Sequence, residues 1–386
     1  MKFIHISDLH LGRRLGEFRL QEEQSALLDW VLRTAAENDA DGILLAGDIY
    51  DRSVPPVEAV TLFDTFLTRL SAMGIPLFAI SGNHDSPERT ACGSSLMHGA
   101  GIHISPCFDG SVRMVPLEKN GQRVYIHLLP FLKPVHAASA YGLPEEELRT
   151  MRCSDAMAAV LSRMTLPADG ANVLLCHQFI TGSTRSESEE VPLVGTLDAV
   201  DAALFGGFDY VALGHLHSVQ AVTETIRYSG TLMPYAFSET EPKGCLLVEV
   251  QDHTVHCTFL PVPAGLTRTL VTLSGPYDTL ISRDYRKNCP HTEEYLKILL
   301  EEDTPVPDAM AKLSVVYPRI VQLSYRRQEG YILAEEDDPA AAGMEQLSPE
   351  AVFASFYARQ NETELSEEDR AYIRSLLSEG GEVCAL

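Results

Sequence analysis

Short, mainly apolar runs that end abruptly in polar residues recur along the first part of the chain. Residues 3–6, 43–46 and 77–80 have the length and composition of buried strands. Between them, residues 19–37 and 57–72 carry apolar side chains three and four positions apart, which indicates amphipathic helices. This alternation of strands and helices predicts a parallel sheet with helices packed on its faces.

Further strand-like runs follow at residues 173–176 and 210–213. Residues 226–228, 245–250 and 255–260 then succeed one another through short connections, and we expect them to form an antiparallel run. Together these elements predict an α/β fold, a layered sandwich that occupies residues 1–265.

The pattern restarts after residue 265. Strand-like runs at residues 270–273, 295–300 and 320–325 surround a helical stretch at 308–316. We therefore expect a small α+β domain over residues 266–330.

Two amphipathic helices are predicted at the end of the chain, over residues 348–386, after an acidic linker at residues 331–347. Two helices cannot bury a core by themselves, so they must dock either on their own domain or in a groove of a partner. Periodicity alone favours docking on their own domain.

Composition excludes several classes of protein. The net charge of −24 argues against a free-standing basic nucleic-acid binder. No apolar run approaches the ~18 residues of a membrane span, and the N-terminus turns polar too early for a signal peptide. The eight cysteines are scattered, as expected for reduced thiols. We expect a cytoplasmic protein with no membrane association.

Side chains that can bind metal ions follow five of the predicted strands within a few residues. The carboxyl ends of strands in an open α/β sheet form the usual ligand site, so these side chains are expected to converge. A lone histidine after a strand is more often structural, but so many suitable residues at strand ends favour a shared site. The candidates are Asp8, His10, Asp48, Asn83, His84, His177, His215 and His217.

The donor types indicate which ions such a site would hold. Carboxylates, imidazoles and one amide, without a thiolate, suit Mn²⁺, Fe²⁺ or Zn²⁺ better than Ca²⁺. A carboxylate such as Asp48 can bridge two ions, and paired divalent ions are suited to phosphoester hydrolysis. The residues therefore predict a site for two divalent metal ions and a hydrolase.

The motifs around these residues resemble those of the calcineurin-like metallophosphoesterases, in order and in spacing. Within that superfamily, residues 1–12, 209–217 and 228–230 are similar to the SbcD family, the nuclease subunits of the bacterial SbcCD DNA repair complex. The resemblance implies a four-layer metallophosphoesterase sandwich with a small capping domain and C-terminal helices. The matching segments are Asp8-Leu9-His10, Gly47-Asp48-Ile49-Tyr50-Asp51-Arg52, Gly82-Asn83-His84-Asp85, His177 and Gly214-His215-Leu216-His217.

The resemblance also implies roles for single residues. His84 would contact the phosphate or the leaving group, and Asp51 would orient His84. Arg52 matches a phosphate-contacting arginine of some phosphatases, although a surface ion pair explains it nearly as well. Arg13 and Arg14 would touch the DNA backbone or belong to a solvated face. One metal ion would be held by Asp8, His10, Asp48 and His217, and the second by Asp48, Asn83, His177 and His215.

For the whole chain, the resemblance implies a DNA repair nuclease with two metal ions, most simply Mn²⁺. It would act as a 3′–5′ exonuclease on double-stranded DNA ends and as an endonuclease on hairpins or blocked ends. The ATPase SbcC would regulate it through ATP and would bind its C-terminal helices, and the family forms homodimers. Two alternatives remain: a phosphoesterase acting on small molecules or proteins, and a non-catalytic scaffold.

Overall fold

The computed structural model describes residues 1–105, 107–184, 199–302 and 304–326, and the single positions 354, 357, 366, 369, 370 and 373. The predicted linker at 331–347 lies outside the described residues, as do the predicted C-terminal helices apart from those single positions. No helix in the described parts of the chain has the length and hydrophobicity that a membrane span requires.

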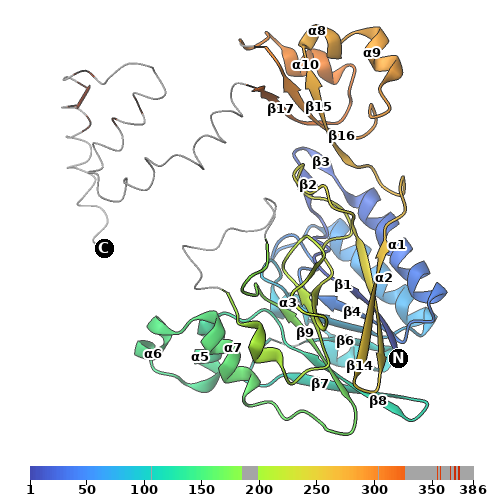
Figure 1. The fold of residues 1–386 in the computed structure, drawn as a ribbon, viewed down its shortest axis with the longest axis vertical. Helices are drawn as coiled ribbons and strands as arrows, with labels where there is room; N and C mark the ends of the chain where they lie inside the picture. Colours follow the sequence, from blue (N-terminus) through green and yellow to red (C-terminus); the bar gives the residue numbers. More distant parts are fainter. Residues whose placement is uncertain are drawn as a thin grey trace. The chain divides into compact units, whose positions relative to one another are not determined.

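Two six-stranded sheets form the framework of residues 1–265 (Figure 1). The first sheet has the order β14-β13-β1-β4-β5-β6, in which β1, β4, β5 and β6 are parallel. Its strands are β1 (Lys2–Ile6), β4 (Gly42–Ala46), β5 (Leu77–Ile80), β6 (Ile102–Ile104), β13 (Gly244–Gln251) and β14 (Thr254–Pro261).

The second sheet has the order β11-β12-β10-β9-β8-β7, and its central strands β8, β9, β10 and β12 are parallel. Three of its strands, β7, β8 and the short β11, have no counterpart among the predicted elements. Its strands are β7 (Arg113–Lys119), β8 (Gln122–Leu128), β9 (Ala171–His177), β10 (Tyr210–Gly214), β11 (Gln220–Ala221) and β12 (Ile226–Tyr228).

One predicted pairing is wrong. Residues 226–228 form β12, which pairs in parallel with β10 in the second sheet, whereas β13 and β14 pair with each other in the first. The chain crosses from one sheet to the other between β12 and β13, and this connection carries side chains to the site described below. The predicted antiparallel run therefore consists of β13 and β14 alone.

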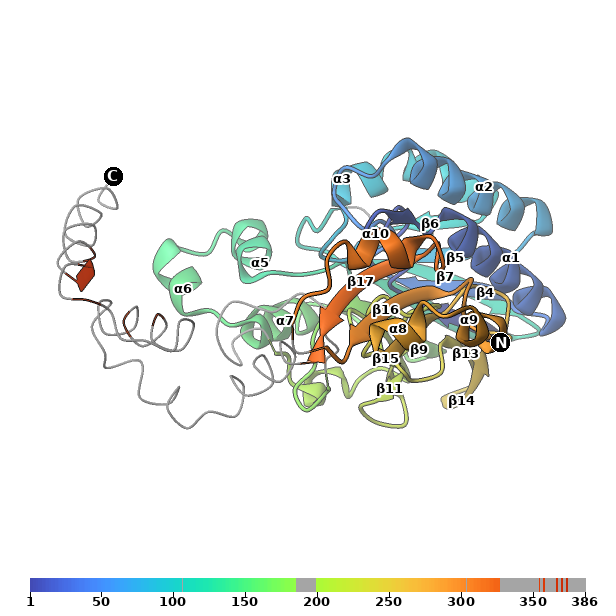
Figure 2. The ribbon, with the colours of Figure 1, turned by 90° about the horizontal axis from the view of Figure 1, so that it is seen from above.

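Helices cover the outer face of each sheet, so the domain has four layers: helices, sheet, sheet, helices (Figures 1 and 2). On the first sheet lie α1 (Gln21–Glu37) and α2 (Val57–Met73), and on the second α5 (Pro134–Tyr141) and α7 (Cys153–Leu161). The short helix α6 (Glu145–Thr150) connects α5 and α7, and the segment after β5 contains α3 (Pro87–Thr90) and α4 (Ser94–Met97).

Strand periodicity explains the layers, because successive side chains of a strand point to opposite faces. In β1, Phe3 packs into the core between the two sheets, whereas Ile4 packs into the core beneath α1 and α2. In β9, Val173 and Leu174 divide in the same way between the central core and the core beneath α5 and α7. The predicted four-layer α/β sandwich is confirmed.

The C-terminal part contains a three-stranded sheet of β15 (Leu270–Gly275), β16 (Tyr295–Leu300) and β17 (Ile320–Tyr325). Its helices are α8 (Tyr277–Leu280), α9 (Arg283–Asn288) and α10 (Ala309–Ser314). The described residues divide into two compact units. One lies within residues 1–273, 281–298 and 310–322, and the other holds residues 274–280, 299–309 and the described residues from 323 onward. The domain boundary at residue 265 stays a prediction.

Candidate metal centre

The carboxyl ends of strands from both sheets deliver the predicted ligands to one place. Residues after β1, β4 and β5 come from the first sheet, and residues at the ends of β9 and β10 come from the second. The sheets pack face to face, so these ends meet, and the ligands form a single cluster. Its members are Asp8, His10, Asp48, Asn83, His177, His215 and His217.

One side of the cluster is formed by His10, His217 and Asp8, whose ligand atoms lie within 4.8 Å of one another. The Nε2 atoms of His10 and His217 are 3.2 Å apart, and His10 Nε2 is 3.8 Å from Asp48 Oδ2. The same four residues were predicted to hold the first metal ion.

The other side is formed around Asn83 and His177. Asn83 Oδ1 lies 3.0 Å from His177 Nε2 and 3.0 Å from His215 Nδ1, and His177 Nε2 is 3.3 Å from Asp48 Oδ2. Asp48 therefore touches both halves of the cluster, as a bridging ligand must. The donor set fits a dinuclear divalent metal site.

The backbone of the ligand loops adopts a conformation that most residues avoid. Positive φ angles occur at Asp8 (52°), His10 (42°), Asp48 (49°) and His215 (100°). Gly82 explains how tightly the loops pack, because a Cβ atom at this position would lie within 2.1 Å of Asp48 Oδ1. The site thus requires a residue without a side chain at position 82, next to the Asp48 carboxylate.

Backbone groups orient several of the ligands. The Nδ1 of His177 is 2.8 Å from the carbonyl oxygen of Ala46, so Nδ1–H donates there and the ring turns Nε2 toward the cluster. The N–H groups of His215 and His84 donate to the carboxylates of Asp8 and Asp48, at 3.1 and 2.9 Å. The loops therefore fix the ligands before any metal ion binds.

Burial dominates the electrostatics of the cluster. It raises the pKa of Asp8 to about 6, against the opposing charge of His177 and with a further contribution from Asp48. It lowers the pKa of His10 well below the ordinary value. For Asp48, burial acts to raise the pKa, but the charge and hydrogen bond of His177 outweigh it and lower the pKa. Two adjacent buried acids are the electrostatic setting that favours bound cations.

His84 borders the cluster. Its ring centroid is 4.8 Å from that of His10, and its Nε2 is 3.9 Å from Asp48 Oδ2. Its Nδ1 lies 3.2 Å from the backbone carbonyl oxygen of Asp51, whereas the Asp51 carboxylate lies 3.3 Å from Arg13 and 3.6 Å from His10 Nδ1. Asp51 thus reaches His84 through its main chain.

The three predicted arginines occupy different surroundings. Arg13 is partly buried and its guanidinium lies 4.8 Å from the centroid of the Tyr235 ring. Arg52 is 75% exposed and 3.6 Å from the Asp51 carboxylate, so it combines a solvated position with an ion pair near the site. Arg14 is exposed and lines a neighbouring cavity.

Asp85 is a residue of the site that the sequence analysis missed. Its buried carboxylate accepts hydrogen bonds from the backbone N–H groups of Ile49, Tyr50 and Gly82 at 3.1, 2.9 and 2.9 Å. It therefore ties the loop after β4 to the loop after β5. Burial raises the pKa of Asp85 to about 6, with Asp48 adding to the shift.

The connection between β12 and β13 supplies further missed residues. Glu239 Oε1 lies 3.6 Å from His217 Nδ1, and Lys243 bridges the Glu239 carboxylate and the backbone carbonyl of His217. The hydroxyl of Tyr235 donates to the Leu9 carbonyl at 2.7 Å. The Glu-Lys spacing of four residues was the only sequence signal for this support.

Comparisons with known proteins agree with this geometry. Residues 1–219 match the calcineurin-like phosphoesterase family, and residues 266–361 match the SbcD_C family, described as the type 5 capsule protein repressor C-terminal domain. The first match alone covers more than half of the chain.

Solved structures similar to the chain include three phosphoesterases of low sequence identity. A dimetal phosphatase from Danio rerio is 12% identical to this chain, with a TM-score of 0.40. The match covers 67% of this chain and 98% of the phosphatase chain. Yfce, a phosphoesterase from E. coli, is 14% identical, with a TM-score of 0.28, covering 64% and 88%. An archaeal phosphodiesterase is 11% identical, with a TM-score of 0.29, covering 67% and 100%.

The two family matches follow each other along one chain, a phosphoesterase domain and then an SbcD C-terminal domain. The chain belongs to the calcineurin-like phosphoesterase family and is an SbcD-type protein.

Proposed function

We propose that this protein is the nuclease subunit of a DNA repair complex and hydrolyses DNA phosphodiesters with two Mn²⁺ ions. The observation that carries the proposal is the buried cluster of seven ligands centred on Asp48, together with the match of residues 266–361 to the SbcD C-terminal domain. The same match supports the cytoplasm as its place of action.

Asp8, His10, Asp48 and His217 would hold one ion, and Asp48, Asn83, His177 and His215 the other. When bound, such a pair of ions supplies a nucleophilic water of lowered pKa and positive charge opposite the phosphate. The chain's own residues fix the ligand atoms, exclude bulk water and position His84.

His84 would act on the phosphate. Its Nδ1–H donates to the Asp51 carbonyl, which leaves Nε2 as the atom that faces the cluster. A proton on Nε2 would stabilise the negative charge that develops on the phosphate and the departing 3′ oxygen.

A partner completes the proposal. An SbcC-type ABC ATPase would bind the C-terminal helices and couple ATP to exonuclease action on double-stranded ends, in the 3′–5′ direction, and to endonuclease action on hairpins or blocked ends. Residues 266–330 would form the DNA-capping domain. The acidity of the chain supports this division of labour, because a net charge of −24 predicts weak DNA binding by the subunit alone.

Exposed apolar side chains support a homodimer. Val54, Val57 and Val60 are 63%, 78% and 43% exposed around the start of α2. We propose that a second copy covers this end of the helix. Val57→Asp should then yield a monomer in light scattering, and an unchanged mass would exclude this interface.

One assay tests the nuclease proposal: the chain with and without its ATPase partner, Mn²⁺ and a hairpin-ended duplex. We expect cleavage by the wild type and by His253→Gln, an exposed histidine that serves as the control, and none by His84→Gln. Metal content should be equal in all three proteins. Full cleavage by His84→Gln would refute the role of His84.

A second experiment separates the DNA nuclease from a phosphoesterase acting on small molecules or proteins. Deleting residues 349–386 should abolish binding of the ATPase partner and ATP-dependent cleavage, while hydrolysis of bis-p-nitrophenyl phosphate persists. Partner binding that survives the deletion would refute the assignment of these helices.

A further inference from the structure

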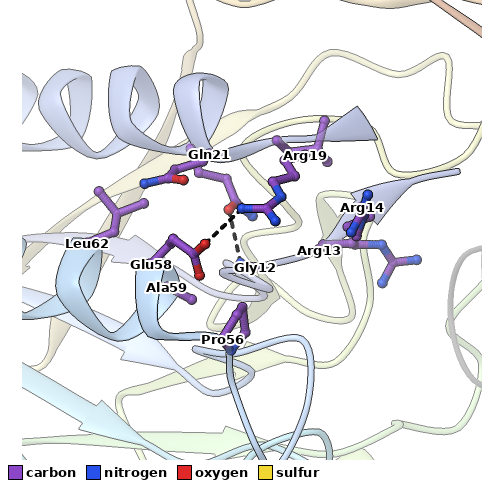
Figure 3. A pocket seen from close by; sticks show the side chains of 11 residues that line it. Gly12, Arg13, Arg14, Arg19, Gln21, Pro56, Glu58, Ala59 and Leu62 are labelled. Carbon is purple, nitrogen blue, oxygen red and sulfur yellow. Dashed lines mark hydrogen bonds and ion pairs between the residues drawn. The ribbon is translucent and has the colours of Figure 1, made fainter. Parts of the chain in front are cut away.

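A cavity of about 100 Å³ opens beside the first ligand loop, between the starts of α1 and α2 (Figure 3). Gly12, two residues after His10, belongs to its lining. The Gly12 N–H donates to Gln24 Oε1 at 3.1 Å, and Gln24 Nε2 donates to the His10 carbonyl at 2.8 Å. One side chain therefore couples the wall of this cavity to a ligand of the metal centre.

The cavity has apolar walls and a positively charged rim. Leu20, Pro56, Ala59 and Leu62 supply the walls, and Arg13, Arg14 and Arg19 contribute to the lining. Residues 13–19 hold these three arginines and a single acid, in a chain whose net charge is −24. An apolar cavity with a few placed polar groups is the usual form of a small-molecule site.

The partners of the arginines indicate the kind of ligand. Arg19 is paired with Glu58 at 2.8 Å and Arg13 with Asp51 at 3.3 Å, so neither offers an uncompensated charge to a bare phosphate. A paired guanidinium can still stack its planar face on an aromatic base. Arg14 donates to the neutral carbonyl of Glu17, a contact that leaves its charge available to an anion. These features match the parts of a nucleotide. The apolar walls and the planar guanidinium suit a base, and the available charge of Arg14 suits a phosphate.

We propose that this cavity receives an unpaired base from the end of a DNA strand, stacked on Arg19, with the phosphate of the same nucleotide at Arg14. The proposal rests on the proposed nuclease function and adds the form of DNA end that the enzyme takes. Stacking of one base strengthens binding roughly 5- to 150-fold. A paired base must first be unpaired and unstacked, which weakens its binding, whereas an already unpaired base largely avoids this cost. The enzyme therefore prefers frayed or single-stranded ends to blunt G·C ends.

Fluorescence of 2-aminopurine tests the proposal, because stacking quenches this base. The probe is a duplex whose terminal 2-aminopurine is either paired or a one-nucleotide overhang, mixed with the full-length His84→Gln protein so that no cleavage occurs. Ala59→Leu, which fills the cavity, and Arg19→Ala, which removes the stacking face, are added to this background. Thr61→Leu is the control, because Thr61 lies on the exposed face of the same helix.

We expect quenching of the overhanging probe, a loss of affinity of roughly fivefold or more in Ala59→Leu and Arg19→Ala, and no loss in Thr61→Leu. Equal quenching in all proteins would overturn the proposal. A changed oligomeric state of Ala59→Leu with unchanged quenching would also overturn it, by assigning the cavity to a second copy. In the background with His84 intact, the control Thr61→Leu should hydrolyse bis-p-nitrophenyl phosphate as fast as the wild type. Failure of the wild type to cleave any DNA would instead refute the nuclease function itself.

Discussion

The carboxylate of Glu239 offers a direct test of how the metal centre is held. It contacts His217 Nδ1 on one side and the Lys243 ammonium on the other, and the side chains of Glu239 and Lys243 are 0% and 7% exposed. Glu239→Gln keeps the shape of the side chain but removes its negative charge. Two consequences follow, one for stability and one for metal binding.

The stability effect arises from Lys243, whose buried charge would lose its partner. Breaking a buried ion pair from one side costs about 3 kcal/mol. The metal effect arises from His217, whose orientation and basicity depend on the group at Nδ1. Loss of such a contact weakens metal binding by roughly 10- to 100-fold, which corresponds to about 1.4 to 2.7 kcal/mol.

Adding Lys243→Met separates the two effects. In urea unfolding of chelator-treated protein, Glu239→Gln should lose about 3 kcal/mol and the double variant should recover most of it. In calorimetric Mn²⁺ titration, both should bind more weakly than the wild type. Glu249→Gln, which breaks an exposed pair with Lys2, is the control and should change stability by less than about 1 kcal/mol. Wild-type affinity in the double variant would refute a positioning role for Glu239.

Two further predictions follow from the packing. Gly82→Ala should displace the Asp48 carboxylate and weaken Mn²⁺ binding by at least about tenfold, as measured by calorimetry, whereas Gly99→Ala, which meets no atom within 4 Å, should bind normally. Burial lowers the pKa of His5 to about 3, so between this value and the ordinary histidine pKa of 6.5 the unfolded state binds more protons. The free energy of unfolding should therefore fall as pH is lowered through this window, by up to about 5 kcal/mol. In His5→Asn this acid sensitivity should shrink, and an identical pH profile of urea unfolding would contradict the reasoning.

The clustering of the candidate ligands could be predicted from the sequence, because the signal for each of them is local. Each follows a buried strand, and the ends of parallel strands must meet. The supports could not be predicted, because they depend on distant packing. Nothing in the connection between β12 and β13 marks Glu239 as a neighbour of His217, and Asp85 looks like any acid beside a ligand motif. The contact of Asp51 with His84 runs through a backbone carbonyl, which is present at every position and therefore carries no sequence signal.

The assignment of strands to the two sheets was limited in the same way, because strand pairing also depends on packing between distant segments. Residues 226–228 gave a correct strand but a wrong partner, because a strand of three residues contains too little pattern to choose between two sheets. The strand β7 was missed because it lies at an edge, is largely exposed, and contains Pro116. Alternation of apolar and polar residues identifies strands that have one buried face. It identifies largely exposed edge strands such as β7 much less well.

The positive φ angles at Asp8, His10 and Asp48 lower the stability of the fold at the residues that the proposed activity needs. Selection for thermal stability and selection for activity therefore favour different residues at these positions. Each such backbone costs roughly 1 kcal/mol, and two neighbouring buried acids add their repulsion. Glycine in place of Asp8, whose buried charge costs stability because its pKa is raised to about 6, would relax both and would make the metal-free protein harder to melt. Directed evolution of this protein for thermostability alone would therefore select mutations that remove its metal ligands. Metal binding must be measured for every stabilised variant.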